Sequence, residues 1–255
     1  MQAEVKTTRT VLVTGASRGI GRAIARAFAE QGDTVVVHCN SRSDDAVATL
    51  SGLVGAGHRI VRGDLTDPEE VRRVVDEAVG EGGLDVLVNN AAHMEPHPIA
   101  ESSYEQWQGA WSRTVDVNLV AAAHASYCAA NAMIAGGRRG HIVNIASRGA
   151  FRGEPDHPAY GASKAALIAM GQSLAVSLAP HNISVTSVAP GFVETERVAS
   201  RLVGDEGALI RSQSPFGRVG TPDEVASAVL YLASSEAMWS SGTVLDVNGA
   251  SHLRM

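Results

Sequence analysis

Hydrophobic positions along the chain switch between two spacings. Short β-branched runs are separated by longer segments, rich in Ala and Leu, in which apolar residues recur every three or four positions. The runs typical of strands are seven, at Thr10–Thr14, Thr34–Cys39, Arg59–Gly63, Val86–Asn89, His141–Ile145, Ser184–Ala189 and Thr243–Val247. The segments typical of helices lie near 19–31, 43–56, 67–80, 103–135, 158–179 and 221–234. This regular alternation predicts a parallel sheet.

The strand-like runs lack polar alternation, as expected when helices cover both faces of a sheet. Right-handed crossovers then give a doubly wound, seven-stranded parallel sheet of the Rossmann type, in the α/β class. No repeat or linker divides the chain, so we expect one domain over residues 1–255. A stretch at 190–220, rich in Gly, Ser, Arg and Glu, interrupts the rhythm. We expect residues of about 190–215 to form a flexible lid over the site.

Composition narrows the class of partner. The chain has 255 residues, 45% of them hydrophobic and 19% charged, which is the balance of a globular protein. Its net charge of -6 disfavours nucleic acid and anionic membrane surfaces as partners, so we expect a small-molecule substrate. The two cysteines, Cys39 and Cys128, are isolated, and the first residues include no apolar targeting segment. These features are typical of a cytoplasmic protein, so we expect a cytoplasmic location.

A glycine-rich loop follows the first predicted strand and opens a helix. Glycines at this place let backbone amides and the helix dipole approach a pyrophosphate. The spacing G-x-x-x-G-x-G differs from both the G-x-G-x-x-G fingerprint and the P-loop, so a simple tight turn is the alternative. The residues expected to hold the phosphates are Gly15, Ser17, Arg18, Gly19, Ile20 and Gly21.

Tyr160 and Lys164 lie four residues apart, so they share one face of the helix predicted to start near 158. A tyrosine has an unperturbed pKa near 10, and a neighbouring ammonium would lower that pKa by favouring phenolate. Only two of the 21 basic residues are lysines, Lys6 and Lys164. A lysine retained inside such an arginine-rich chain is therefore a candidate functional group, and an exposed solubilising pair is the alternative.

Ser147 and Asn118 are polar residues for which a structural interpretation stands beside the functional one. Ser147 follows the fifth predicted strand and would lie with Tyr160 at the carboxyl edge of the sheet, where its hydroxyl could bind a carbonyl oxygen. A serine there is otherwise a helix cap. Asn118 lies in an Ala/Val/Leu-rich helical segment, where a satisfied buried amide is the simple interpretation.

Two further clusters are assigned no chemistry. His93, Glu95 and His97 fall within five residues, but Pro96 prevents the regular helix that an H-E-x-x-H site needs, so we predict no metal. The tryptophans Trp107 and Trp111 share a helix face and indicate core or a subunit interface.

Several motifs in one order now define a resemblance that covers nearly the whole chain. They are TGASRGIG at 14–21, Asp64-Leu65, NNAA at 89–92, Asn118, Ser147, the Tyr160-Gly-Ala-Ser-Lys164 run, and Pro190-Gly191 with Thr195. In these the sequence resembles the short-chain dehydrogenase/reductase family, and is most similar to its 3-oxoacyl-acyl-carrier-protein reductase-like branch. One departure is Ala92, where the family usually has glycine; we expect a slightly displaced backbone there.

The resemblance implies a set of roles. Hydride would pass between a nicotinamide cofactor and a carbonyl carbon, with Ser147 holding the carbonyl oxygen and Tyr160 exchanging the proton. Lys164 would tune Tyr160, and Asn118 would distort its helix and hold a water in a proton relay. The family also implies a homotetramer. The further cofactor-binding residues that it implies are Asn40, Asp64, Leu65, Asn90, Tyr160, Lys164, Val193 and Thr195.

Cofactor choice depends on the residue that ends the second strand. An enzyme that prefers NAD generally has a carboxylate there for the ribose 2′-hydroxyl. This chain has neutral Cys39, and no acidic residue follows until Asp44, whereas Arg18 and also Arg42 are placed to pair with a 2′-phosphate. We therefore predict NADP (NADPH), with NAD as the alternative.

The expected activity is NADPH-dependent reduction of a ketone or a β-keto thioester. The alternative within the family is an NAD-dependent secondary-alcohol or diol dehydrogenase. A non-catalytic dinucleotide sensor is a third hypothesis, whose hallmark would be a broken Ser/Tyr/Lys set. Arginines at 197, 201 and 211 mix with apolar residues in the predicted lid, so the sequence leaves open whether the pocket takes an apolar chain or an acidic group.

Overall fold

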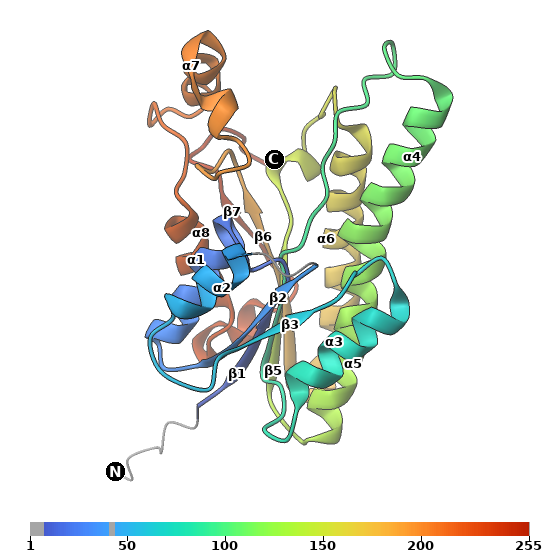
Figure 1. The fold of residues 1–255 in the computed structure, drawn as a ribbon. Helices are drawn as coiled ribbons and strands as arrows, with labels where there is room; N and C mark the ends of the chain where they lie inside the picture. The colour runs from blue at the N-terminus through green and yellow to red at the C-terminus, as the bar shows by residue number, and fades with distance from the viewer. Residues whose placement is uncertain (1–7, 41–43, 255) are drawn as a thin grey trace.

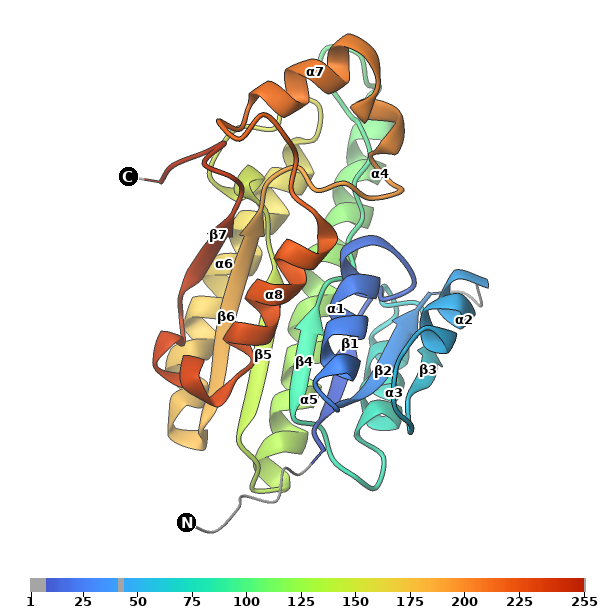
Figure 2. The ribbon, with the colours of Figure 1, turned by 90° about the vertical axis from the view of Figure 1, so that its left-hand side faces the viewer.

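A single parallel sheet organises the molecule. The computed structural model describes residues 8–40 and 44–254. The sheet has seven strands in the order β3-β2-β1-β4-β5-β6-β7 (Figure 2). The strands are β1 (Thr10–Val13), β2 (Thr34–Cys39), β3 (Arg59–Arg62), β4 (Val86–Asn89), β5 (Gly140–Ile145), β6 (Ile183–Pro190) and β7 (Val244–Val247). The predicted fold class is confirmed, and each strand starts and ends within one residue of its predicted bounds.

Helices cover both faces of the sheet (Figure 1). One face carries α1 (Gly19–Glu30), α2 (Asp44–Ser51) and α8 (Pro222–Leu232). The other carries α3 (Pro68–Val79), α4 (Tyr104–Val115), α5 (Ala121–Ala135) and α6 (Pro158–Leu178). A further helix, α7 (Gly204–Ser212), stands beyond the carboxyl ends of the strands.

Short helical turns join these elements. They are the π-helical turn η1 (Asp116–Val120) and the 3₁₀ turns η2 (Arg148–Ala150), η3 (Ala179–His181), η4 (Ala199–Leu202) and η5 (Ser235–Ser240).

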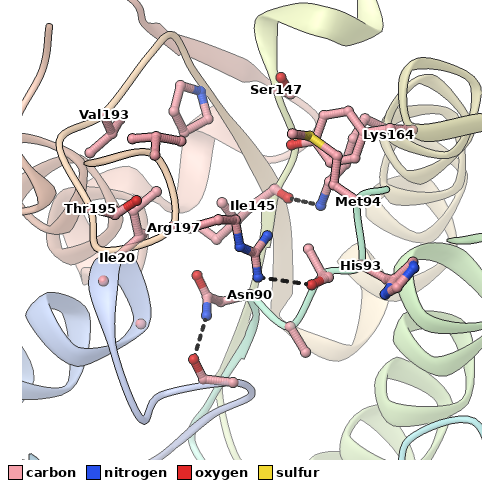
Figure 3. A pocket seen from close by; sticks show the side chains of 18 of the residues that line it. Ile20, Asn90, His93, Met94, Ile145, Ser147, Lys164, Val193, Thr195 and Arg197 are labelled. Atoms are coloured by element: carbon pink, nitrogen blue, oxygen red, sulfur yellow. Dashed lines mark hydrogen bonds between the residues drawn. The ribbon is translucent and has the colours of Figure 1, made fainter. Parts of the chain in front are cut away.

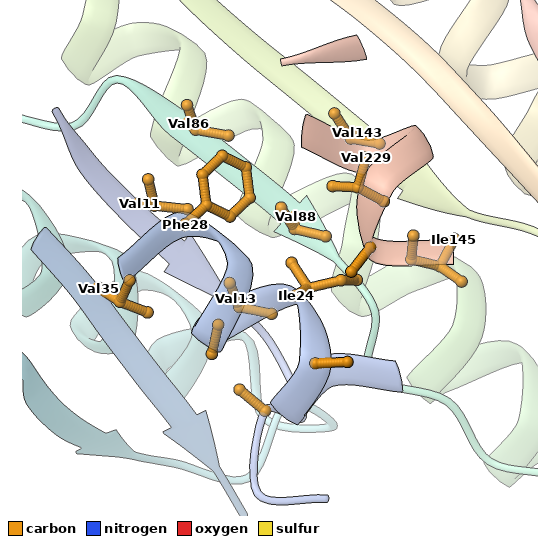
Figure 4. Close-up of a cluster of buried hydrophobic side chains, with 14 of the residues drawn as sticks. Val11, Val13, Ile24, Phe28, Val35, Val86, Val88, Val143, Ile145 and Val229 are labelled. Carbon is orange, nitrogen blue, oxygen red and sulfur yellow. The ribbon is translucent and has the colours of Figure 1, made fainter. Parts of the chain in front are cut away.

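Alternate residues of each strand enter two separate cores, because successive side chains of a strand point to opposite faces. Val11 and Val13 pack with Ile24 and Phe28 of α1 in the first core (Figure 4). Leu12, between them, packs into the second core beneath α3 and α5. All five side chains are fully buried, which explains why the strands read as unbroken apolar runs.

One predicted helix differs from the structure. The helix expected over 103–135 is divided into α4 and α5 by η1, which contains Asn118. The interruption comes from contacts that Asn118 makes outside its own helix, so the apolar spacing does not reveal it. The segment at 190–220 contains the helical elements η4 and α7, and its role as a flexible lid stays a prediction.

One described helix, Pro158–His181, is long and apolar enough by composition to span a bilayer, with a mean hydropathy of 1.3. In the fold it is α6 continued by η3, and it packs against β6 and η2. Apolar composition here serves a helix that lies against the sheet.

Candidate functional site

A cavity of about 610 Å³ opens at the carboxyl edge of the sheet, where loops from six strands converge (Figure 3). It spans the point between β1 and β4 at which the strand order reverses, the usual ligand position in a doubly wound sheet. All of the predicted cofactor-binding residues line it: Gly15, Ser17, Arg18, Gly19, Ile20, Gly21, Asn40, Asp64, Leu65, Asn90, Tyr160, Lys164, Val193 and Thr195. Ser147 lines it as well.

The glycine-rich loop leaves no room for side chains. Gly15 and Gly19 have φ angles of +62° and +55°, a region that disfavours other residues. A Cβ on Gly21 would lie 2.5 Å from Asn90 Nδ2. The loop thus brings bare backbone and the N-terminus of α1 to the cavity wall. This arrangement fits the pyrophosphate of a dinucleotide, which a helix N-terminus attracts.

His38 of β2 holds this loop in place. Its Nδ1 accepts a hydrogen bond from Gly15 N at 3.1 Å, so its Nε2 carries the proton and donates to Gly63 O at 3.0 Å. Burial lowers the pKa of His38 and keeps the ring neutral, as this pair of bonds requires. The sequence gives only one signal for this role of His38, a titratable residue inside the mostly apolar β2.

Asn90 supports the same loop rather than presenting its amide to the cavity. Its Nδ2 donates to Thr14 O at 2.8 Å and to Gly15 O at 3.1 Å. Thr14 Oγ1 accepts from the backbone N–H groups of Asn90 and Ala91 at 2.9 and 3.0 Å. The role of Asn90 is therefore to join the turns after β1 and β4, a contact that spacing alone does not show.

The end of β2 carries no carboxylate at the positions described. Cys39 is buried, and Asn40 is exposed at the cavity wall. Arg18, the residue that precedes α1, is exposed at the same wall. Asp64 accepts hydrogen bonds from Thr66 N and Oγ1 at 2.9 and 2.8 Å, which fixes the turn after β3. Arg42 lies outside the described residues.

Ser147, Tyr160 and Lys164 line the same cavity. Ser147 follows β5, and its Oγ accepts a hydrogen bond from Gly149 N at 3.0 Å. Tyr160 and Lys164 project from α6, and Lys164 Nζ lies 5.7 Å from the centroid of the Tyr160 ring. Lys164 is only 2% exposed and donates to Ile145 O at 2.7 Å (Figure 3). The three groups line one wall, where a carbonyl oxygen would meet both hydroxyls.

Burial governs the electrostatics of this trio. Burial raises the pKa of Tyr160, although hydrogen bonding to Ser147 and the charge of Arg197 oppose the rise. Burial and, to a smaller extent, the charge of Arg197 lower the pKa of Lys164 to about 7. The expected depression of the Tyr160 pKa is therefore not seen in this geometry, because desolvation outweighs the nearby charges. Tuning of Tyr160 by Lys164 stays a prediction.

Asn118 lies outside the main cavity and lines a smaller one beside it. Its Oδ1 accepts from His93 N at 2.7 Å, and its Nδ2 donates to His93 O and to Ser163 Oγ, both at 3.0 Å. These bonds satisfy its buried amide and tie η1 to the turn after β4 and to α6. A satisfied amide and a distorted helix are both present, and the proton relay stays a prediction.

The His93–His97 segment follows β4 and reaches the cavity through His93 and Met94. His97 is buried; its Nδ1 contacts Glu95 O, and its Nε2 accepts from Ala159 N at the start of α6. Among the described residues there is no group of three or more side chains arranged for a metal ion. Trp107 packs edge-on against His97 and lies 6.0 Å from Trp111, so the tryptophan pair belongs to this packing.

Ala92 adopts an ordinary backbone conformation. Among the described non-glycine residues, positive φ angles occur at Asn182 and Ala250. The oxygen of Ala92 accepts a hydrogen bond from Arg197 Nη2 at 3.2 Å (Figure 3). Alanine is thus accommodated where the family pattern has glycine, and its carbonyl anchors the segment after β6.

Comparisons with known proteins agree with this geometry. A family model described as enoyl-(acyl carrier protein) reductase matches residues 15–252. The chain is 39% identical to cis-4-hydroxycyclohexanecarboxylate dehydrogenase of Sinomonas cyclohexanicum, over 94% of this chain and 95% of that protein. It is 36% identical to the 3-oxoacyl-acyl-carrier-protein reductase of Escherichia coli, over 96% of this chain and 98% of that one.

Solved structures give the same result. A short-chain type dehydrogenase/reductase from Mycobacterium marinum superposes with a TM-score of 0.87 at 33% identity, covering 96% of each chain. A protein from Agrobacterium tumefaciens with bound NADP has a TM-score of 0.85 at 31% identity, covering 95% of this chain and 96% of that one. The chain therefore belongs to the short-chain dehydrogenase/reductase family and is an oxidoreductase that uses a nicotinamide cofactor on alcohol or ketone substrates.

Proposed function

We propose that the protein is an NADPH-dependent carbonyl reductase in which Ser147, Tyr160 and Lys164 form the catalytic group. The cofactor, when bound, supplies or receives the hydride. The single observation that supports the choice of NADPH is the wall after β2, where Cys39 and Asn40 stand without a carboxylate and Arg18 faces the same cavity. An arginine pairs with a 2′-phosphate that a carboxylate would repel.

The roles of the protein groups follow from their positions. Ser147 Oγ orients the substrate oxygen, and the Tyr160 hydroxyl gives its proton to that oxygen as negative charge develops on it. The raised pKa of Tyr160 suits donation, because the phenol stays protonated until the oxygen is basic. Lys164 Nζ retains donors beyond its bond to Ile145 O, which can contact a ribose hydroxyl. Asn118 fixes η1 beside them.

The test compares kcat/KM for NADPH and NADH with a panel of ketones, and compares Arg18→Ala with the unmodified enzyme. We expect NADPH to be preferred and Arg18→Ala to raise KM for NADPH about tenfold while leaving KM for NADH unchanged. Arg26→Ala, in the middle of the same helix and outside the cavity, is the matched control. An equal or higher kcat/KM with NADH would instead identify an NAD-dependent alcohol or diol dehydrogenase.

We further infer a cytoplasmic homotetramer. The edge strand β7 is only half-buried, and Trp239 of η5 is fully exposed. Val176 on α6 is also exposed, at 79%. Exposed apolar side chains beside an open sheet edge are typical of surfaces that another copy covers.

A further inference from the structure

The substrate end of the cavity contains a buried cation that the proposed reaction does not use. Arg148 directly follows Ser147, lines the cavity and is only 5% exposed. A buried guanidinium normally has a carboxylate partner, because removing its charge from water costs much free energy. Within residues 8–40 and 44–254, Arg148 forms no ion pair.

The bonds that Arg148 makes are to neutral groups. Its Nη1 donates to Ser251 Oγ at 2.6 Å, and its Nη2 donates to Gln213 Oε1. Its Cζ lies 4.9 Å from the centroid of the Phe192 ring. A guanidinium has five N–H donors in one plane, so donors remain for a ligand in the cavity. These neutral partners fix the orientation of the guanidinium without a direct ion pair, and the nearby carboxylate of Glu154 acts on its charge from beyond ion-pair distance.

The surroundings add positive charge. Arg201 Cζ lies 5.5 Å from the same Phe192 ring, and Arg152 and Arg197 line the same end of the cavity. The carboxylates at this end are those of Glu154 and Asp156, and burial raises the pKa of Glu154. Arg201 is ion-paired with Glu206, but Arg148, Arg152 and Arg197 still outnumber Glu154 and Asp156 at this end of the cavity, which favours an anion there.

We propose that Arg148 binds the carboxylate of the substrate, so that the enzyme acts on compact keto acids and the matching hydroxy acids. A carboxylate fits the planar fork of a guanidinium and would provide a direct ion-pair partner for Arg148. Ser147 and Arg148 are consecutive residues that line the same cavity, so one compact molecule would carry both the carbonyl and the carboxylate. Phe192, whose ring lies against Arg148, would contact the carbons between the two groups. This assignment rests on the proposed function and names its substrate class.

The test measures reduction of 3-oxobutanoate, 4-oxopentanoate and 4-oxocyclohexanecarboxylate, each beside its neutral methyl ester. For at least one pair, we expect kcat/KM to be about tenfold or more higher for the acid, as charge-assisted hydrogen bonds provide. Dihydroxyacetone phosphate, beside dihydroxyacetone, tests the other common anion. Methyl esters equal to their acids throughout, or a larger preference for the phosphate, would overturn the carboxylate assignment.

Variants separate binding from support of the fold. Arg148→Met should raise KM for the preferred acid about tenfold or more with a small change in kcat, and leave the methyl ester within about threefold. Arg148→Lys should recover part of the loss. The matched control, Arg139→Met, removes an exposed arginine outside the cavity and should change the acid-to-ester ratio less than threefold.

A purely structural Arg148 would give a different pattern, lowering kcat/KM for acid and ester equally, and that result would overturn the inference. If Arg148→Met does not fold, the wild-type comparison and Arg148→Lys still decide. If the wild-type enzyme reduces neither acids nor neutral ketones with either cofactor, the proposed function fails. If it reduces neutral ketones well and acids poorly, the proposed function stands and the carboxylate site fails.

Discussion

The Nδ1 atom of His38 accepts a hydrogen bond from the backbone N–H of Gly15, so a neutral imidazole sets the position of the glycine-rich loop. His38→Leu would leave Gly15 N and Gly63 O without partners. We expect a loss of about 1–3 kcal/mol in the free energy of unfolding, together with a higher KM for NADPH and a nearly unchanged kcat. Chemical denaturation and initial rates measure both. His181→Leu, on the surface, is the control, and an unchanged KM in His38→Leu would contradict the positioning role.

Removal of the Tyr160 hydroxyl should abolish turnover and preserve cofactor binding. In Tyr160→Phe we expect kcat to fall by about 10² to 10⁴, the usual contribution of a general acid. Cofactor titration by fluorescence should show affinity within a few-fold of the unmodified enzyme. Tyr104→Phe, at a tyrosine that is 73% exposed, should leave both quantities unchanged. Turnover of Tyr160→Phe within about tenfold of normal would exclude this residue as the acid.

The buried ammonium of Lys164 should lower the free energy of unfolding of the cofactor-free protein. Its pKa is lowered from 10.5 to about 7 by burial, so between these pH values the unfolded chain binds a proton that the folded chain does not. Lys164→Met should therefore stabilise the fold most below pH 7, by about 2 kcal/mol or more, and the gain should shrink as the pH rises toward 10.5. Activity should be lost.

Melting temperatures of both proteins at pH 6, 8 and 10 check this prediction. Lys164→Met less stable than the parent at pH 6 would show that the bond to Ile145 O outweighs the desolvation of the ammonium.

Assembly should depend on the exposed apolar surface near β7. Light scattering should give a mass about four times the 26.5 kDa of one chain. Trp239→Ser should shift the population toward smaller species at micromolar concentration without altering the cavity, because Trp239 is fully exposed in the single chain. A monomer mass for the unmodified protein would disprove the tetramer.

Much of this fold could be predicted because the relevant forces act locally. Val11, Leu12 and Val13 are buried on both faces of the sheet, so their apolar run alone identifies a strand. The resemblance to the family implies a helix distorted at Asn118, but the apolar spacing does not predict this π-turn, because it is stabilised by His93 and Ser163, which are distant in the sequence. For the same reason the sequence does not indicate a binding role for Arg148. Its neutral partners, Gln213 and Ser251, approach it only in the folded chain.

The site residues also divide into those that local spacing predicts and those whose contacts depend on the fold. Tyr160 and Lys164 were found because four-residue spacing on one helix guarantees proximity. Asn90 was correctly placed at the cavity, but its amide binds the Thr14 and Gly15 carbonyls, a contact that depends on the register between β1 and β4.

The segment after β6 has a consequence for the order of ligand entry. Glu196 forms an ion pair with Arg22 of α1 at 3.2 Å, while Arg197 binds Ala92 O on the opposite wall. Val193 and Thr195 are among the residues proposed to bind the dinucleotide, and the Phe192 ring lies against Arg148. The segment after β6 is thus fastened at both ends and lines the proposed sites of both ligands. If the proposed dinucleotide packs against this segment, it would add contacts for the second ligand, so we expect an ordered kinetic scheme in which the nucleotide binds first and leaves last.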